Sequence, residues 1–165
     1  MSQDFDAILQ ANQRYAQTFE HDGLSGKAAA GLAVVTCMDV RVDPLPILGL
    51  RPGDANILRN PGGRVTPQVL EALVLATHLL GVERVMVIEH TRCAVAGSTP
   101  EAVRQRVSDA SGKDASWQPF LVAGDQETAL REDVAAVRSY PLLADGVEVG
   151  GFMYDVDTGL VSRVV

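Results

Sequence analysis

The sequence predicts an α/β fold of three layers, with a central, mostly parallel β-sheet flanked by helices and a C-terminal antiparallel hairpin. Two short runs, 32–36 and 84–88, are almost continuously apolar, as expected for strands covered on both faces. Helical segments separate these runs, which favours parallel pairing through crossover connections. The segments 149–155 and 160–164 alternate around Asp157-Thr158-Gly159, which predicts the closing hairpin.

The N-terminal part of the chain is expected to form a helix, a loop and the first strand. Residues 3–20 carry apolar side chains at steps of three and four, which predicts an amphipathic helix. The apolar face consists mainly of Phe5, Ile8, Leu9, Tyr15 and Phe19. Small and polar residues at 21–31 predict a loop, and 32–36 follow as the first central strand.

The middle of the chain is expected to alternate between helices and strands. The predicted elements are a short helix at 44–48, a strand at 55–58, a helix at 66–80 and a strand at 84–88. Thr66 provides a cap, Pro67 a first-turn proline and Gly81 a stop for the longer helix. Because its apolar residues cover more than one narrow stripe, we expect this helix to be largely buried.

Two further helices are predicted before the hairpin, at about 100–110 and at 126–139, and Pro141 ends the second. Trp117, Phe120 and Tyr154 are expected in the core or in an interface, since large aromatic residues bury well. No internal repeat interrupts this order, so residues 1–165 are interpreted as a single domain.

Composition narrows the class of protein. The formal net charge is -7 and the sequence pI is about 4.8, which disfavours nucleic acid as a partner. The N-terminal residues are polar and acidic rather than signal-like, and no apolar run has the roughly 20 residues that span a membrane. We therefore expect a soluble cytoplasmic protein. Its two cysteines are too few for the disulfide framework of a secreted domain.

Metal-binding side chains follow two of the predicted strands. Cys37, Asp39 and Arg41 follow the first central strand, and His90 and Cys93 follow the strand at 84–88. Because the carboxyl ends of parallel strands meet at one edge of a sheet, these side chains are expected to converge. Thiolate and imidazole ligands suit zinc, so the sequence predicts a zinc site held by both cysteines and the histidine. A disulfide between the cysteines, or two buried thiols without metal, are the alternatives.

The fourth zinc position decides what such a site does. Asp39 could occupy it permanently, which would make the site closed and structural. Alternatively, Arg41 holds Asp39 in an ion pair and water takes the position, so that a hydroxide forms and the aspartate orients it. A switch between the two forms is also compatible with the sequence. His21 and His78 lie outside this constellation and are expected to be solvated or structural.

A glycine pair follows the predicted strand at 55–58. Gly62 and Gly63 come after Asn60-Pro61, at a strand end that should lie near the metal. Glycine lets the backbone approach a neighbouring group closely, so the pair serves either as a turn or as the wall that contacts substrate.

Three motifs in this order, CMDVR, RNPGGRVT and HTRC, resemble the β-class carbonic anhydrases, and GFMYDVDTGL in the hairpin extends the likeness. The resemblance implies a β-carbonic anhydrase-like fold and a zinc lyase that interconverts carbon dioxide and bicarbonate by attack of zinc-bound hydroxide. It implies zinc ligation by Cys37, His90 and Cys93, and a catalytic pair of Asp39 and Arg41. It also implies a homodimer or higher homo-oligomer, in which residues 1–25 form a helical arm on a partner subunit.

The sequence departs from the family pattern near the site. Ala94 stands where the family usually has glycine, and Pro61 where it usually has alanine. Arg64 replaces a commonly apolar residue, and we expect it to add charge near the entrance of the site. Relatives with this metal set hydrolyse carbonyl sulfide or carbon disulfide, which is the alternative activity. A non-catalytic zinc protein capped by Asp39 is the third hypothesis.

Overall fold

The structure is a computed structural model that describes residues 5–165, so positions 3 and 4 of the predicted first helix lie outside the described residues. Its elements are α1 (Phe5–Ala16), β1 (Leu32–Cys37), α2 (Pro44–Ile47), β2 (Ala55–Asn60), the short 3₁₀ turn η1 (Pro61–Gly63), α3 (Pro67–Leu79), β3 (Arg84–His90), α4 (Pro100–Ser111), α5 (Gln126–Arg138), β4 (Glu148–Tyr154) and β5 (Val161–Arg163). The predicted order of helices and strands is confirmed, and most ends agree within two residues.

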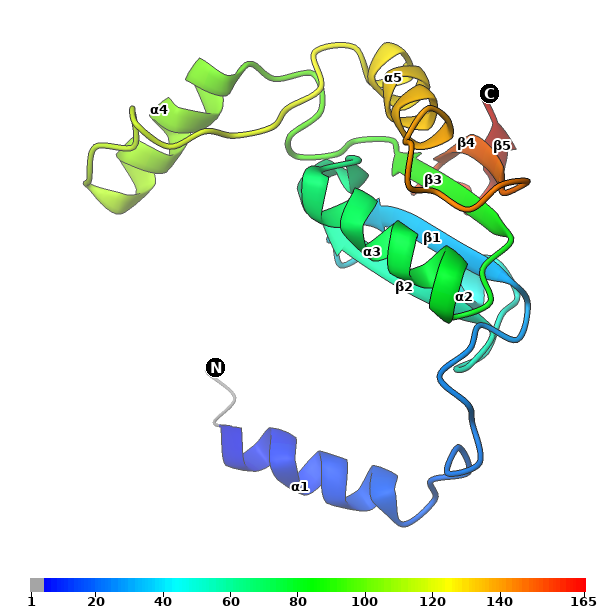
Figure 1. Cartoon of the computed structure of the whole chain (residues 1–165). Coiled ribbons are helices and arrows are strands. Elements are labelled where there is room, and N and C mark those ends of the chain that lie inside the picture. Colours follow the sequence, from blue (N-terminus) through cyan, green and yellow to red (C-terminus); the bar gives the residue numbers. More distant parts are fainter. Residues whose placement is uncertain (1–4) are drawn as a thin grey trace.

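The five strands form one sheet in the order β2-β1-β3-β4-β5 (Figure 1). Strands β2, β1, β3 and β4 are parallel to one another, and β5 pairs antiparallel with β4 as the closing hairpin. From β1 the chain goes first to β2 on one side and later to β3 on the other. In parallel sheets, ligands bind at such a reversal, beyond the carboxyl ends of the strands. The reversal lies between the strands that carry Cys37 and His90.

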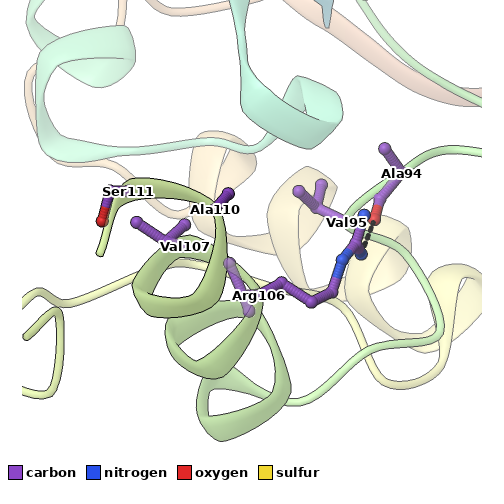
Figure 2. A pocket seen from close by; sticks show the side chains of 7 residues that line it. Ala94, Val95, Arg106, Val107, Ala110 and Ser111 are labelled. Atoms are coloured by element: carbon purple, nitrogen blue, oxygen red, sulfur yellow. Dashed lines mark hydrogen bonds between the residues drawn. The ribbon is translucent and has the colours of Figure 1, made fainter. Parts of the chain in front are cut away.

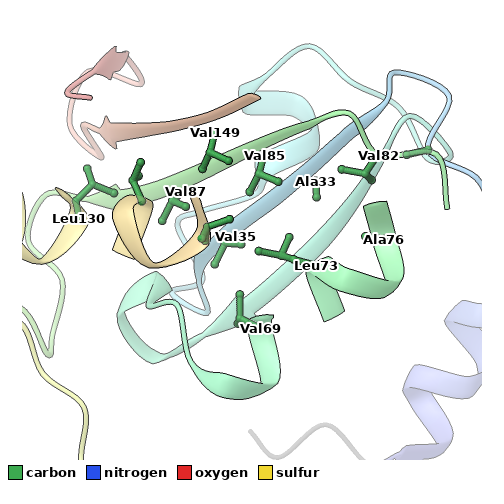
Figure 3. Close-up of a cluster of buried hydrophobic side chains, with 13 residues drawn as sticks. Ala33, Val35, Val69, Leu73, Ala76, Val82, Val85, Val87, Leu130 and Val149 are labelled. Atoms are coloured by element: carbon green, nitrogen blue, oxygen red, sulfur yellow. The ribbon is translucent and has the colours of Figure 1, made fainter. Parts of the chain in front are cut away.

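Each face of the sheet packs against a different set of residues. Figure 3 shows the larger cluster, in which residues of α3 and α5, such as Leu73 and Leu130, pack on valines of β1 and β3. The second cluster lies on the opposite face, where Val42, Ile47 and Leu48 cover Val34 and Ile88. The predicted α/β class with a central parallel sheet is therefore confirmed. Both clusters fix β1 and β3, the two strands that end at the site.

Helix ends follow the chemistry expected from the sequence. The Thr66 hydroxyl accepts a hydrogen bond from the Val69 N–H at 3.3 Å, and Pro67 occupies the first turn of α3. Asp125 caps α5 in the same way, accepting from the Thr128 N–H at 2.7 Å. These caps determine where each helix begins relative to the sheet.

The expected burial of α3 is wrong for this chain. Only Val69, Leu73 and Ala76 of the helix are buried, while Leu75 and Leu79 are 49% and 62% exposed. The apolar residues do cover more than one stripe, but a single sheet face can bury only one of them. His78 also lies on the exposed side, where its Nε2 contacts the Leu142 carbonyl oxygen at 3.0 Å.

Helix α1 extends away from the sheet (Figure 1), and none of its residues is buried. Phe5, Ile8 and Leu9 are all exposed on it. Trp117, expected in the core or in an interface, is likewise exposed in this chain, whereas Tyr154 is buried as part of the second cluster. None of the described helices is long and apolar enough to cross a membrane.

Candidate metal centre

Two strand ends and one loop bring together three side chains that could hold a metal ion. Cys37 is the last residue of β1, His90 is the last residue of β3, and Cys93 follows in the next loop. All three are buried, and their ligand atoms lie within 4.8 Å of one another. The convergence predicted from the sequence is therefore present in the structure.

The spacing of the donor atoms suits zinc. A tetrahedral zinc ion with Zn–S bonds of about 2.3 Å holds two sulfur atoms about 3.8 Å apart, and the Cys37 and Cys93 Sγ atoms are 3.9 Å apart. The His90 Nδ1–H donates to the Thr91 carbonyl oxygen at 2.9 Å. That bond leaves Nε2 as the lone-pair nitrogen, and this atom is buried without a hydrogen-bond partner among the described residues. The donor set fits a zinc ion.

The two thiols differ in acidity. The hydrogen bond from Cys93 is the main cause that lowers the pKa of Cys37 to about 4, and the same bond raises the pKa of Cys93. The Gly62 N–H also donates to the Cys37 Sγ, at 3.3 Å. These bonds favour Cys37 over Cys93 as the thiolate of the pair.

Arg41 holds Asp39 in the ion pair that the sequence suggested. Its Nε and Nη2 donate to the two carboxylate oxygens at 2.9 and 2.7 Å, and its backbone N–H donates to Oδ1 at 3.0 Å. These bonds hold the pKa of Asp39 well below its usual range, so it stays ionised. Its Oδ2 lies 3.9 Å from the His90 Nε2, beside the metal-binding atoms without a hydrogen bond to them. Arg41 thus occupies both carboxylate oxygens.

Arg92 links the ion pair to the loop that carries Cys93. Its backbone has a φ of 54°, and it is the only residue other than glycine with positive φ in the described chain. Its carbonyl oxygen accepts a hydrogen bond from the Arg41 Nη2 at 3.0 Å, and its guanidinium pairs with Asp157 in the hairpin turn. This left-handed residue was not foreseen, because arginine carries no sequence signal for such a conformation.

The glycine pair forms a tight turn against the sheet. The Asn60 side chain closes this turn by pairing with the backbone N–H and carbonyl of Arg64, at 2.9 and 2.7 Å. Gly63 has a φ of +70°, and a Cβ there would lie 3.0 Å from the Cys37 backbone nitrogen. Gly62 lines the cavity beside the metal-binding atoms, whereas Gly63 approaches the backbone of β1. A substrate contact from either glycine remains a prediction.

A cavity of about 210 Å³ opens beside Cys37 and Cys93. Its walls are mainly apolar, with Asp39 and the two cysteines as the polar groups; the other lining residues are Met38, Pro61, Gly62, Ala94 and Val95. Such a space admits a small, weakly polar molecule to the donor atoms.

The larger cavity, of about 520 Å³, lies along α4 (Figure 2), and Cys37, His90 and Cys93 are not among the residues that line it. Val95, Val107 and Ala110 line it, and Arg106 reaches across to the Ala94 carbonyl oxygen at 3.4 Å. Ala94 and Val95 also line the smaller cavity, so these two residues separate the two spaces. The volume of a cavity does not identify the site here, because both cysteines line the smaller cavity and neither lines the larger one.

The expectation that Arg64 adds charge near the entrance is wrong. Its side chain is buried and forms a two-point ion pair with Asp133 of α5, at 2.7 and 3.1 Å. The Asp133 carboxylate also accepts from the Val65 N–H at 3.0 Å. Arg64 points inward because Asp133 offers the buried carboxylate that its charge requires.

Glu89 lies in the same buried region and was missed by the sequence reasoning. It is 1% exposed, and neither carboxylate oxygen has a hydrogen-bond partner among the described residues. Burial raises its pKa to about 7 despite the nearby Arg64 charge. The available signal was one acidic residue that follows the apolar run 85–88 and directly precedes His90.

Comparisons with known proteins converge on one family. A family model described as carbonic anhydrase matches residues 32–161, a range that contains the whole metal centre. β-Carbonic anhydrase 1 of Mycobacterium tuberculosis is 29% identical over 159 residues, covering 96% of each chain. A carbon disulfide hydrolase of Acidianus sp. is 32% identical over 153 residues, covering 77% of this chain and 74% of that protein. The crystal structure of a carbonic anhydrase from Streptococcus mutans superimposes with a TM-score of 0.90 at 38% identity, over all of both chains.

Proposed function

The chain belongs to the β-carbonic anhydrase family, as its motifs indicated, and we propose on that premise that it catalyses the reversible hydration of carbon dioxide to bicarbonate and a proton. Cys37, His90 and Cys93 would hold a zinc ion as three of its four ligands. The observation that carries the proposal is the ion pair of Asp39 and Arg41. The fork of Arg41 orients both carboxylate oxygens, and Oδ2 lies 3.9 Å from the His90 Nε2 without a hydrogen bond to it, which supports a role for Asp39 beside the ion rather than as its ligand.

When bound, zinc supplies a Lewis acid that makes water a nucleophile near neutral pH. Asp39 accepts a hydrogen bond from this nucleophile and directs its lone pair toward the cavity. Arg41 keeps Asp39 ionised and fixed in orientation, through the two bonds of its fork. The apolar walls at Met38, Pro61 and Val95 receive carbon dioxide without competing for the nucleophile. The reaction adds hydroxide to the carbon, and the proton from the water passes to solvent buffer.

The test replaces Asp39 by asparagine, which keeps the shape of the side chain and removes its charge. We expect kcat for carbon dioxide hydration to fall by about 100-fold or more, the usual scale for losing a group that handles the reacting proton. Zinc content should stay at one ion per chain, because Asp39 is not needed as a ligand. Asp145→Asn, on the exposed surface, is the matched control. Full activity of Asp39→Asn, or loss of its zinc, would refute the roles assigned here.

Hydrolysis of carbon disulfide or carbonyl sulfide at the same site is the second candidate. Two observations favour it: the 32% identity to a carbon disulfide hydrolase and the apolar lining of the cavity, which suits a sulfur-containing substrate equally well. Assays of the purified zinc protein with each gas separate the two activities. Rapid release of sulfide with negligible hydration of carbon dioxide would replace the first candidate by the second. Inactivity toward all three gases from pH 7 to 9, with zinc bound, would favour a non-catalytic zinc site.

We further propose that the chain works as a homodimer or higher homo-oligomer, with residues 1–25 as an arm on a second copy. Support comes from α1, which buries none of its residues in the single chain while exposing Phe5, Ile8 and Leu9. Ile8→Glu should shift the protein toward monomer in sedimentation experiments, whereas a monomeric wild-type protein would contradict the arm. Two thiols used as metal ligands also suit a reducing compartment, which supports a cytoplasmic location.

A further inference from the structure

Arg59 of β2 donates to two backbone carbonyl groups of the segment that carries Cys37 and Asp39. Its Nε donates to the Cys37 oxygen at 3.0 Å, and its Nη2 donates to the Asp39 oxygen at 2.8 Å. The register of β1 and β2 pairs Thr36 with Arg59, so the side chain reaches past the end of β1. None of the ion pairs within residues 5–165 includes Arg59. Among the described residues, its guanidinium therefore donates to backbone carbonyl groups and not to a carboxylate.

The segment after β1 lacks the packing that would otherwise fix it. Met38 and Val40 alternate with the functional residues and are 60% and 97% exposed. Between Cys37 and Val42, the next buried apolar residue, hydrogen bonds rather than apolar contacts hold the segment against the sheet. One of these bonds runs from the Met38 N–H to the Asn60 carbonyl oxygen at 3.0 Å, and Arg59 supplies two more.

We propose that Arg59 is a positioning residue of the metal centre: its planar fork joins the Cys37 and Asp39 carbonyl groups and so fixes the metal-binding thiolate relative to the nucleophile-orienting carboxylate. The two carbonyl groups flank Met38, and a fork with donors at a fixed spacing binds both at once. A lysine ammonium is a single point donor and cannot bridge them in the same geometry. The proposal uses the zinc ligands and Asp39 as assigned under the proposed function, but its metal-binding readouts do not depend on the reaction.

The loss of Arg59 has a specific structural consequence. Asp39 Oδ2 lies 3.9 Å from the His90 Nε2, so a small shift of the segment carries the carboxylate toward the metal position. Released from Arg59, the segment would hold Cys37 less firmly and let Asp39 approach the ion. Residues that orient metal ligands in this indirect way typically change metal affinity by about 10–100-fold. We expect effects of that size here.

The experiment compares Arg59→Ala and Arg59→Lys with Arg51→Ala as the matched control. Arg51 is an exposed arginine of the preceding loop, and none of the side-chain hydrogen bonds and ion pairs of the described chain involves its guanidinium. Zinc affinity is measured by competition with a chromophoric chelator, and the coordination geometry by the visible absorption spectrum of the Co²⁺-substituted protein. The pH dependence of kcat and the KM for carbon dioxide complete the set.

We expect Arg59→Ala to bind zinc about 10–100-fold more weakly, to change the Co²⁺ spectrum, and to lower kcat while KM stays within about twofold. Arg59→Lys should recover part of each loss, and Arg51→Ala should match wild type. Should Arg59→Ala not fold, Arg59→Lys carries the test through the same readouts. Wild-type zinc affinity and an unchanged Co²⁺ spectrum in Arg59→Ala would overturn the proposal. Full recovery by lysine would also overturn it, since charge rather than the fork would then be sufficient.

The outcomes also separate this proposal from the proposed function. Altered zinc affinity and an altered Co²⁺ spectrum in a protein whose wild type does not hydrate carbon dioxide would support Arg59 as a positioning residue and refute the activity. If the wild type hydrates carbon dioxide and Arg59→Ala changes neither this activity nor the zinc affinity, the result would support the proposed function and refute Arg59 as a positioning residue.

Discussion

Replacing Gly63 by alanine tests whether the metal centre depends on close contact between the glycine turn and the sheet. At a φ of +70°, a Cβ at this position would lie 3.0 Å from the Cys37 nitrogen, 3.0 Å from the Thr36 carbonyl carbon and 3.1 Å from the Ile88 oxygen. All three atoms belong to the backbone of β1 and β3, which cannot move without disturbing the sheet. Gly49 is a closely matched control, because its φ is +68° and a Cβ there would meet no atom within 4 Å.

The two variants share one destabilising effect and differ in the other. Placing alanine in a left-handed conformation costs about 1–2 kcal/mol at either position. Overpacking against fixed atoms adds about 1–3 kcal/mol, at Gly63 only. We therefore expect Gly63→Ala to lower the free energy of unfolding by about 2–5 kcal/mol, and Gly49→Ala by about 1–2 kcal/mol. For a chain of this length, each kcal/mol corresponds to about 2–4 °C in Tm.

The assay is chemical and thermal unfolding of the zinc-loaded proteins at equal protein and zinc concentrations, since ligand and partner concentrations shift apparent stability. Gly63→Ala should also bind zinc more weakly, because the contact falls on the peptide bond of a metal ligand. Equal unfolding free energies for the two variants would refute the claim that the glycine turn packs directly on the strand ends.

Three further predictions follow from the same region. Cys93→Ser should lower zinc content sharply when measured by metal analysis, because a hydroxyl is a poor replacement for the thiolate ligand; one zinc per chain would contradict the ligand set. Asp133→Ala should reduce the free energy of unfolding by about 3–5 kcal/mol, since it leaves the buried Arg64 charge unpaired. Glu132→Ala, on the exposed side of α5, should have little effect. Similar losses of stability in the two variants would argue against the ion pair of Arg64 and Asp133. Glu89→Gln tests pH dependence: the fold raises the pKa of Glu89 from 4.5 to about 7, so the wild type loses stability as pH rises between these values. The stability of Glu89→Gln relative to wild type should therefore increase by about 2.5 kcal/mol between pH 5 and pH 8, and a pH-independent difference would contradict the raised pKa.

Local signals made most of the fold predictable. The strands at β1 and β3 were evident because both of their faces are covered, which requires uninterrupted apolar residues. Thr66 with Pro67 defined where α3 begins, because a cap and a first-turn proline act within one turn. The convergence of Cys37 and His90 followed from parallel pairing, which brings strand ends together whatever the separation in sequence.

The features that were missed depend on partners distant in the chain. Arg64 was expected at the entrance because its partner, Asp133, lies 69 residues away on a helix whose orientation the sequence does not reveal. Arg59 donates to backbone carbonyl groups, and the Arg92 backbone accepts from Arg41; backbone acceptors leave no mark on residue type. The exposed side of α3 was misjudged because apolar periodicity shows which residues avoid water and not whether this chain alone covers them.

The proposed zinc ligands are far apart in the sequence, which would tie metal capture to the late stages of folding. Cys37 and Cys93 are 56 residues apart, so an unfolded chain must close a long loop before both sulfurs reach one ion. Only the parallel alignment of β1 with β3 closes that loop, and such non-local pairing is slow to form. Zinc should therefore bind tightly only after β1 and β3 have paired. A chelator should shift the folding equilibrium toward the unfolded chain, instead of removing zinc from a chain that stays folded.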